Sequence, residues 1–381
     1  MKLNKYKCLH FFFLLYSIIK IIRHLVHSSI VTMPKIFNDP IHGHIEISDI
    51  CVKIIDTPQF HRLRDVAQLG GLYYVFSGAS CNRFEHSLGV SHLAKLFAEK
   101  LRTNQPELGI TDVDILCVEI AGLIHDLGHG PFSHMFDMKF LKYFNKYPEF
   151  EHETASVGIF ELLIEENNLT PHLRHYGIQD ADVHFIKELI YGSKDEVPAG
   201  FQWKGRGEKT FLYHIVANKV NSIDVDKFDY FARDCKALGM SISFDCHRLM
   251  KFARVMWVNR ADSGDSDSYN ASQSSQNSVT GTPTRTDRPK SSGSSGQLEI
   301  CFHIKEAWNL FELFHTRYAL HKRAYQHKVS AAVESMICEA FVLADPYIFL
   351  VRLFINLTAS PVDAAVCAAF VHFDYLCLTL T

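Results

Sequence analysis

The sequence predicts a mainly α-helical protein with a few short strands. Residues 34–258 have the composition of a helical globular domain, and in Asp112–Leu127 apolar residues recur at helical spacing. Thr111 and Asp112 stand at the start of this run and are suitable N-cap residues. With 47% hydrophobic residues in 381 positions, the chain can bury a sizeable core.

Other elements follow in chain order. Asn38–Ile47 alternates apolar and polar residues, which predicts a short strand or hairpin. Phe185–Tyr191 and Phe211–Val220 have helical patterns. Leu298–Phe302 favours a strand, and Ala307–Lys328, rich in aromatic and basic residues, predicts one long helix.

The first 32 residues differ in character from the rest of the chain. Lysines precede the apolar run Phe11–Ile19, as in a secretory signal, but basic residues follow at once and the run is too short to cross a bilayer. We therefore interpret residues 1–32 as an extension that does not conform to the main domain, with Met33 as an alternative start. A signal anchor is the minority alternative.

Composition divides the remainder into four parts. Residues 33–260 form the main domain, and the run 261–297 of serine, glycine, asparagine and threonine predicts a disordered insertion. Residues 298–348 begin a C-terminal helical region. The apolar, charge-poor tail 349–381 is typical either of a buried helix or of a truncated or mis-spliced end.

Charge and cysteine content exclude some classes of function. The formal net charge of −3 gives no overall attraction to nucleic acid or to anionic membranes. Ten cysteines without paired spacing indicate reduced thiols rather than a disulfide framework, and none is a good metal ligand candidate. The 22 histidines, many of them between His86 and His152, are a weak indication of metal or acid–base chemistry.

The adjacent pair His125 and Asp126 is the most informative local feature. It lies where an apolar run meets a glycine-rich break, so both side chains would sit at the negative end of a helix dipole, where a cation is favoured. His86, with Arg83 one helical turn before it, and the acids of Asp224–Asp234 are further candidates for the same site. Spacing alone leaves two alternatives open, a metallohydrolase or ordinary core histidines beside a solvated acidic face.

The order of His86, His125-Asp126 and Asp226 resembles the HD superfamily of metal-dependent phosphohydrolases. From about Pro34 to Tyr347 the chain resembles more closely the animal deoxynucleoside triphosphate triphosphohydrolases that carry a sterile-alpha-motif domain before the HD domain. The motifs that carry this resemblance are Asn38–Ile47, Ile54–Phe60, Gln68–Gly71, Asn82–Gly89, His125–Phe136, Asp224–Asp234 and Arg323–Lys328.

The resemblance implies an HD-domain helical bundle that hydrolyses deoxynucleoside triphosphates to a deoxynucleoside and inorganic triphosphate. It implies that His86, His125, Asp126 and Asp226 bind the metal, and that His134, with Asp137 as its orienting partner, His129 and His152 are the catalytic and phosphate-contacting residues. The residues implied in substrate binding are Gln68, Leu69, Arg83, Lys227, Tyr230, Asp234, Arg317, Tyr325 and Gln326.

The resemblance also implies activation by nucleotides bound between subunits. Lys35, Asp56 and Arg64 match the guanine-nucleotide site of the family, although His61 stands in place of the usual glutamine and His303 in place of a usual arginine. The sterile-alpha-motif domain and the C-terminal lobe beyond about Tyr347 are absent from this sequence, which places allosteric assembly in question. The second effector site is matched by Asn38, Val75, Phe76, Arg254, Lys305, His327 and Lys328.

The expected cofactors are a divalent metal (iron, zinc or manganese) at the HD site and Mg²⁺ with the nucleotide. The expected partners are dNTP substrates, GTP or dNTP effectors, further copies of the chain and single-stranded nucleic acid, with no membrane. The family's location implies the nucleus or cytoplasm. Two alternatives remain open: a catalytically silent protein that binds nucleotides or nucleic acid, and an HD nucleotidase that acts on another nucleotide, such as a monophosphate.

Overall fold

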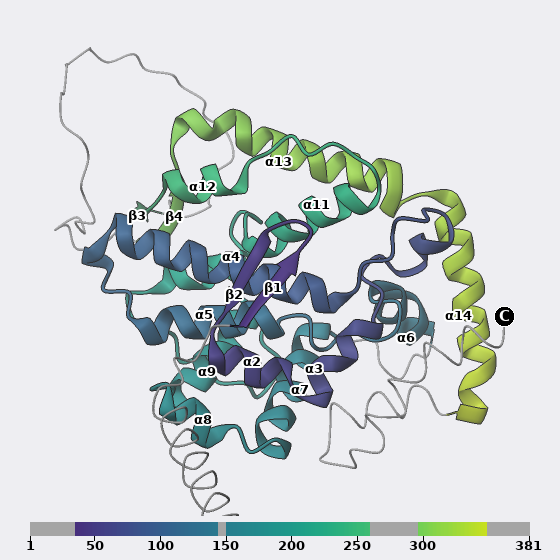
Figure 1. The fold of residues 1–381 in the computed structure, drawn as a ribbon, viewed down its shortest axis with the longest axis horizontal. Helices are drawn as coiled ribbons and strands as arrows, with labels where there is room; N and C mark the ends of the chain where they lie inside the picture. The colour runs from purple at the N-terminus through teal and green to yellow at the C-terminus, as the bar shows by residue number, and fades with distance from the viewer. Residues whose placement is uncertain (1–34, 144–149, 260–295, 349–381) are drawn as a thin grey trace, which may run out of the picture.

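The computed structural model describes residues 35–143, 150–259 and 296–348, and it confirms the mainly α-helical prediction (Figure 1). Helices surround a central pair, and the described strands form two small antiparallel sheets. The predictions for residues 1–32 and 349–381, and for nearly all of the serine-rich insertion, lie outside the described residues. Among the helices that the structure describes, none combines the length and hydropathy that crossing a membrane requires.

The N-terminal half of the chain supplies both central helices. Its elements are β1 (Lys35–Asp39), β2 (Gly43–Ile47), α2 (Asp49–Ile55), α3 (Pro58–His61), η1 (Arg62–Asp65), η2 (Gly70–Tyr74), α4 (Arg83–Asn104), η3 (Pro106–Leu108), α5 (Asp112–Ile124), the π-helical η4 (Phe136–Phe140), α6 (Leu141–Tyr143), α7 (His152–Glu166), α8 (Thr170–His175) and α9 (Asp180–Tyr191).

The C-terminal half supplies the elements that cover the central helices. They are η5 (Thr210–Leu212), α10 (Tyr213–Val216), α11 (Val225–Ala237), α12 (Cys246–Phe252), β3 (Ala253–Asn259), β4 (Gly296–Phe302), η6 (Ile304–Glu306), α13 (Ala307–Leu320), the π-helical η7 (His321–Tyr325) and α14 (Lys328–Ile348).

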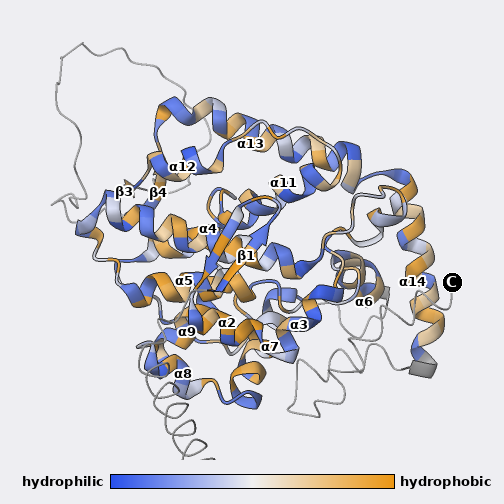
Figure 2. Ribbon diagram, viewed as in Figure 1, coloured by the Kyte–Doolittle hydropathy of each residue, from blue (hydrophilic) through white to orange (hydrophobic). Residues whose placement is uncertain are grey.

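Helices α4 and α5 form the centre of the core, and Figure 2 shows hydrophobic segments of both in the interior. They approach closely at Gly122, where a Cβ would lie 3.1 Å from the Cβ of Ala94 and 3.1 Å from the carbonyl oxygen of Val90. Most apolar side chains of α5 are buried, so the hydrophobic effect holds this helix in place. The pair is therefore a rigid frame for whatever side chains it carries.

A capping box starts α5 and confirms Thr111 as its N-cap. The Asp114 amide donates to Thr111 Oγ1 (3.1 Å), and the Thr111 amide donates to Asp114 Oδ2 (2.9 Å). Burial opposes ionisation of Asp114, but hydrogen bonds from Lys209, Thr111 and Arg206 outweigh it and lower the pKa of this carboxyl below its usual value. The cap therefore also ties α5 to the 206–209 segment.

Both predicted β features are present. The hairpin pairs Lys35 with Ile47 and Asp39 with Gly43, so it begins three residues before the expected Asn38. The predicted strand is β4, which begins at Gly296, two residues before the expected Leu298. Its partner β3 was not predicted, because the two strands are separated in sequence by the insertion and their pairing is non-local.

Two helix predictions are wrong in extent. The helix expected over Phe211–Val220 stops at Val216, because Asn218 Oδ1 accepts from the amide of Val220 (3.0 Å) and turns the chain. The single helix expected over Ala307–Lys328 is divided. It changes to a π-helix after Leu320, where the Gln326 amide donates to the His321 carbonyl (3.0 Å), and α14 starts as a new helix at Lys328.

Replacing Asp114 by Asn should lower the free energy of unfolding by about 1–3 kcal/mol at pH 7, because a buried, multiply bonded carboxylate is lost. Since the pKa of Asp114 is lower in the folded protein, its contribution is complete above the unfolded value near pH 4 and is lost as the pH falls further. Urea denaturation at several pH values measures the difference. Asp112→Asn, at an exposed carboxyl, is the control, and a loss for Asp114→Asn that stays constant below pH 4 would contradict the assignment.

Candidate active site

Four predicted ligands converge on one point between three segments. His86 lies in α4, His125 is the C-cap residue of α5 with Asp126 directly after it, and Asp226 lies in the first turn of α11. His86 Nε2 is 3.0 Å from Asp226 Oδ1 and 3.3 Å from Asp126 Oδ2. His125 Nε2 is 3.5 Å and 3.4 Å from the same two oxygens. The structure thus brings together the four side chains that the resemblance implies as ligands.

The outer nitrogen of each histidine ring is already bonded. His86 Nδ1 donates to Asp229 Oδ2 (2.7 Å), and His125 Nδ1 donates to the Gly122 carbonyl (2.8 Å). Both Nε2 atoms are buried and lack a hydrogen bond of acceptable geometry among the described residues. Rings oriented in this way by carboxylate and carbonyl acceptors are typical of histidines that bind a metal. The residues present therefore fit a divalent cation.

Electrostatics also favour a cation here. Burial alone would raise the pKa of Asp126, but the nearby Arg83 cation, with His125 and His129, holds it well below its usual range. Burial would lower the pKa of His86, but the adjacent carboxylates of Asp126, Asp226 and Asp229 raise it well above its usual value. The cluster thus attracts positive charge strongly, and a cation can take the place of the protons that the histidines would otherwise bind.

A second cluster consists of His129, His134, Asp137 and His152, whose ligand-type atoms lie within 4.8 Å of one another. The expectation that Asp137 orients His134 is wrong, because Asp137 Oδ2 accepts from His129 Nδ1 (2.8 Å). His129 stacks on His152 with ring centroids 4.1 Å apart. Burial raises the pKa of Asp137 to about 6, while burial and the Arg83 cation lower the pKa of His129 to about 4.

Two contacts hold the segment that carries both clusters. Arg62 donates to the carbonyl of His129 (2.7 Å) and to that of Leu127. His129 Nε2 lies 3.3 Å from Asp126 Oδ1, so the two clusters are neighbours. Arg83 donates to Asp126 Oδ2 (2.5 Å) and to Ser133 Oγ (2.9 Å), and its buried guanidinium thus joins the ligand pair to the following loop.

These clusters open into a cavity of about 710 Å³. Two buried acceptors in its wall, Gln68 Oε1 and Asp234 Oδ1, have no hydrogen-bond partner within the described part of the chain. Asp234 receives a hydrogen bond from the Tyr325 hydroxyl (2.5 Å) on its other oxygen, and burial raises its pKa to about 7. The predicted residues in the wall are Gln68, Leu69, Arg83, His125, Asp126, His129, His134, His152, Asp226, Lys227, Tyr230, Asp234, Arg317 and Tyr325.

The sequence prediction and the cavity differ in a few residues. Gln326 was expected to contact substrate, but it is not among the residues that line the cavity. Asp224 was not assigned, yet it caps α11 and holds Lys227 Nζ at 3.0 Å. Glu334 of α14 reaches the cavity and pairs with Lys139 (2.7 Å). No local motif marks Glu334, since only the position of α14 brings it there.

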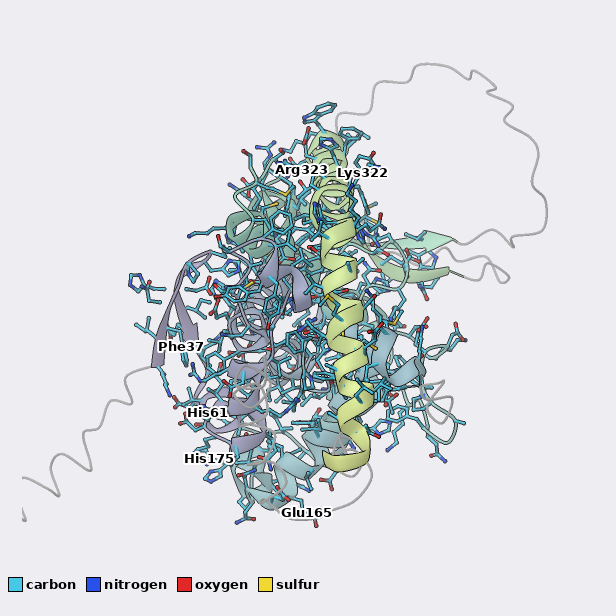
Figure 3. The ribbon with its side chains drawn as sticks, turned by 90° about the vertical axis from the view of Figure 1, so that its right-hand side faces the viewer. Phe37, His61, Glu165, His175, Lys322 and Arg323 are labelled. Carbon is cyan, nitrogen blue, oxygen red and sulfur yellow. The ribbon has the colours of Figure 1, made fainter. Side chains whose placement is uncertain are left out.

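The residues expected at the guanine-nucleotide site lie together on the surface. Lys35 pairs with Asp56 (3.2 Å), and the Arg64 guanidinium is 3.5 Å from the centroid of the Phe84 ring. Arg64 also donates to His61 Nδ1 (3.3 Å), so the histidine that replaces glutamine is part of this group. In Figure 3, Phe37 and His61 lie near one another at one edge of the molecule.

The residues expected at the second effector site do not form one group in a single chain. Phe76 contacts His327, with ring centroids 5.7 Å apart, near the start of α14. Arg254 is in β3, and Lys305 in η6 lies over the Phe252 ring (3.5 Å). In Figure 1, β3 and α14 are at opposite sides of the molecule. One nucleotide could touch all these residues only if more than one copy contributed them.

Comparisons with known proteins agree with the geometry. The family model of the HD domain matches residues 83–233. The chain is 52% identical over 315 residues to the deoxynucleoside triphosphate triphosphohydrolase SAMHD1 of Gallus gallus, which covers 82% of this chain and 45% of that protein. The corresponding Homo sapiens protein is 48% identical over 336 residues, with 87% and 48% covered. A homologue in Dictyostelium discoideum is 40% identical over 314 residues, with 82% and 50% covered.

The chain thus spans about half the length of these curated relatives. The matched HD region begins at Arg83 and ends at Arg233, and it contains all four residues of the candidate metal site. The chain therefore carries an HD domain and resembles the SAMHD1 deoxynucleoside triphosphate triphosphohydrolases over most of its length.

Proposed function

We propose that this protein hydrolyses deoxynucleoside triphosphates to a deoxynucleoside and inorganic triphosphate. The observation that carries the proposal is the convergence of four metal-ligand side chains, three of which (His125, Asp126 and Asp226) line a cavity that also contains basic groups and acceptors without a partner among the described residues. The relatives named as triphosphohydrolases support the same substrate class. Such a cavity has the volume of a typical small-molecule site.

The side chains divide by the part of the nucleotide that each suits. Arg83, Lys227 and Arg317 supply positive charge for the triphosphate. The unpartnered acceptors of Gln68 and Asp234 suit a sugar hydroxyl donor. Leu69 and Tyr325, also in the wall, are the side chains that we assign to pack against the sugar and to exclude a 2′-hydroxyl.

We assign proton transfer to the second cluster, which consists of His129, His134, Asp137 and His152. His134 lies in the cavity wall, and it is the residue that we assign to protonate the leaving 5′-oxygen. Burial and His129 lower its pKa to about 3, so it takes up that proton when the negative triphosphate is bound beside it. His129, held by Asp137 and stacked on His152, faces Asp126 and keeps the donors of this wall in a fixed arrangement. When bound, a divalent cation lowers the pKa of water and offsets phosphate charge. Histidine and carboxylate ligands suit iron, zinc or manganese, with Mg²⁺ on the nucleotide.

Two other functions remain as competitors. A protein that binds nucleotides without hydrolysing them would use the same cavity, but the complete ligand set favours catalysis. A nucleotidase for monophosphates would need fewer cationic groups than the cavity wall provides. Activation by a guanine nucleotide is part of the proposal, and the surface group around Lys35 and Arg64 supports it.

Incubation of the full chain with dGTP, Mg²⁺ and Mn²⁺, with and without GTP, should release deoxyguanosine and triphosphate, which ion-exchange chromatography separates. Asp126→Ala and Asp226→Ala should each reduce the rate to the background level, because each removes a metal ligand. Glu107→Ala, on the remote element η3, is the matched control and should keep the wild-type rate. Release of deoxyguanosine monophosphate instead of triphosphate would overturn the proposed reaction.

His134→Ala should lower kcat by about 10²–10⁴-fold with a much smaller change in KM, since loss of a general acid affects mainly the chemical step. Steady-state kinetics on dGTP measure both constants. His172→Ala, at an exposed histidine of α8 outside the cavity wall, provides the comparison. A KM that rises while kcat is unchanged would show that His134 binds substrate rather than transferring a proton.

Self-association is the final part of the proposal, and an aromatic surface on α13 supports it. Trp308 is 70% exposed, Phe311 54% and Tyr318 64%, while Trp308 and Phe311 stack with centroids 5.0 Å apart. In Figure 1, α13 forms an outer edge of the molecule. Exposed hydrophobic patches of this kind usually mark an interface. This aromatic surface and the separation of the second effector residues both fit an assembly of several copies.

The double change Trp308→Ala and Phe311→Ala should shift the chain from an oligomer toward a monomer, because it removes the largest apolar groups of this surface. Sedimentation velocity over a range of concentrations measures the distribution. Met336→Ala, at a 69% exposed residue on α14, is the control and should leave the distribution unchanged. A wild-type chain that is monomeric at every concentration would refute self-association.

A further inference from the structure

A chain of two hydrogen bonds connects the N-terminal hairpin to the metal-ligand histidine of α4. His42, in the turn between β1 and β2, lies with Nε2 at 2.7 Å from Asp229 Oδ1. The other oxygen of Asp229 accepts from His86 Nδ1, also at 2.7 Å. The His42 side chain is 3% exposed and those of Asp229 and His86 are fully buried, so water does not compete for these bonds.

The Asp229 carboxylate is saturated by its partners. Arg233 donates from Nε to Oδ2 (2.9 Å) and from Nη2 to Oδ1 (2.8 Å), so each oxygen accepts from one histidine and one guanidinium nitrogen. An ionised carboxylate only accepts, which requires protons on His42 Nε2 and on His86 Nδ1. The lone pair of His86 is thereby left on Nε2, the nitrogen that faces Asp126 and Asp226.

The hairpin turn is itself fixed in place. Asp39 Oδ1 accepts from the amides of Ile41 (2.7 Å) and His42 (2.9 Å), and Asp39 Oδ2 accepts from Arg233 Nη1 (3.0 Å). Arg233 therefore holds both the turn and the carboxylate to which the turn donates. Hydrogen bonds thus fix both the backbone and the ring of His42, so its position does not depend on burial alone.

The neighbouring helix leaves space for this arrangement. Gly89 follows His86 by one helical turn, and a Cβ at this position would lie 1.8 Å from Asp229 Oδ1 and 2.6 Å from Arg233 Nη2. Glycine inside a helix costs about 1 kcal/mol relative to alanine. Only a residue without a side chain lets Asp229 reach the ring of His86 and the ring of His42 together.

We propose that His42 is a positioning residue of the metal site, which orients Asp229 and through it the ring of His86. This inference rests on the proposed function only in requiring that His86, His125, Asp126 and Asp226 bind a divalent cation. Outer partners of metal-bound histidines typically change metal affinity by about 10–100-fold when they are removed. His42 lies one residue farther from the cation than such partners and acts through the orientation of Asp229.

The test measures binding of Mn²⁺ and Co²⁺ to the full chain, by competition with a chelator and by the visible absorption of bound Co²⁺. His42→Ala should weaken binding by roughly 10-fold or more and alter the Co²⁺ spectrum, because Asp229 loses one donor. His42→Gln should restore most of the affinity, since its amide reaches about as far as Nε2 and can donate. His44→Ala, at an exposed histidine of the same hairpin, should bind like the wild type.

Each outcome decides something. If His42→Ala binds both ions as tightly as the wild type, His42 does not position the site. If His42→Gln binds as weakly as His42→Ala, donation to Asp229 is not the role of His42. If His42→Ala fails to fold, the comparison of His42→Gln with the wild type provides the test. If the wild-type chain binds neither ion, the proposed metal site itself is overturned. If the wild-type chain binds the ions and His42→Ala binds them equally well, only the inference about His42 is overturned.

Discussion

The rings of His86 and His125 can face the same metal site only if the helices that carry them, α4 and α5, approach closely. Gly122 allows α4 and α5 to do so, since a Cβ at that position would be 3.1 Å from Ala94. The carbonyl of the same glycine accepts from His125 Nδ1 and turns the ring toward His86, whose centroid is 5.2 Å away. The close approach of the helices and the orientation of the His125 ring thus both depend on Gly122. Asp126 and Asp226 can complete the ligand set only when the helices approach in this way.

The buried charges around this point are arranged in layers. The innermost carboxylates, Asp126 and Asp226, face the histidines, and Arg83 and Lys227 lie beside them. Farther out, Asp229 is paired with Arg233, which neutralises a carboxylate that would otherwise be costly in the core. Apolar side chains in these positions would avoid the desolvation cost of the buried charges, but they would not attract a cation. The desolvation cost is therefore a necessary part of a site that binds positive charge.

Local patterns were sufficient to predict much of the fold and to single out His125 and Asp126 as candidate ligands. The start of α5 at Thr111 followed from capping chemistry, and the adjacent His125 and Asp126 indicated a ligand pair at the other end of the same helix. The order of the remaining ligands became informative only through resemblance to a family. The hairpin was predictable because its strands are close in sequence.

What escaped prediction depends on contacts between distant segments. The partner of Asp137 depends on how the chain folds after Asp126, which brings His129 Nδ1 to Asp137 Oδ2 and stacks His129 on His152. His42 and Asp229 are separated by 187 residues, so no spacing rule relates them. The division of the expected helix at Leu320 has a similar origin, since Tyr325 of the π-helical turn donates to Asp234 in α11.

The antiparallel pairing of β3 and β4 has a consequence for how the chain can vary in length. Asn259 pairs with Gly296, so the polypeptide leaves this ribbon and returns to it at neighbouring positions. In Figure 1 the ribbon lies at the margin of the molecule, far from α6 and α14. For a loop between two fixed ends, each doubling of its length costs only about 0.6 kcal/mol in closure entropy. This junction is therefore a natural site for an inserted reporter or affinity domain that leaves the helical core undisturbed.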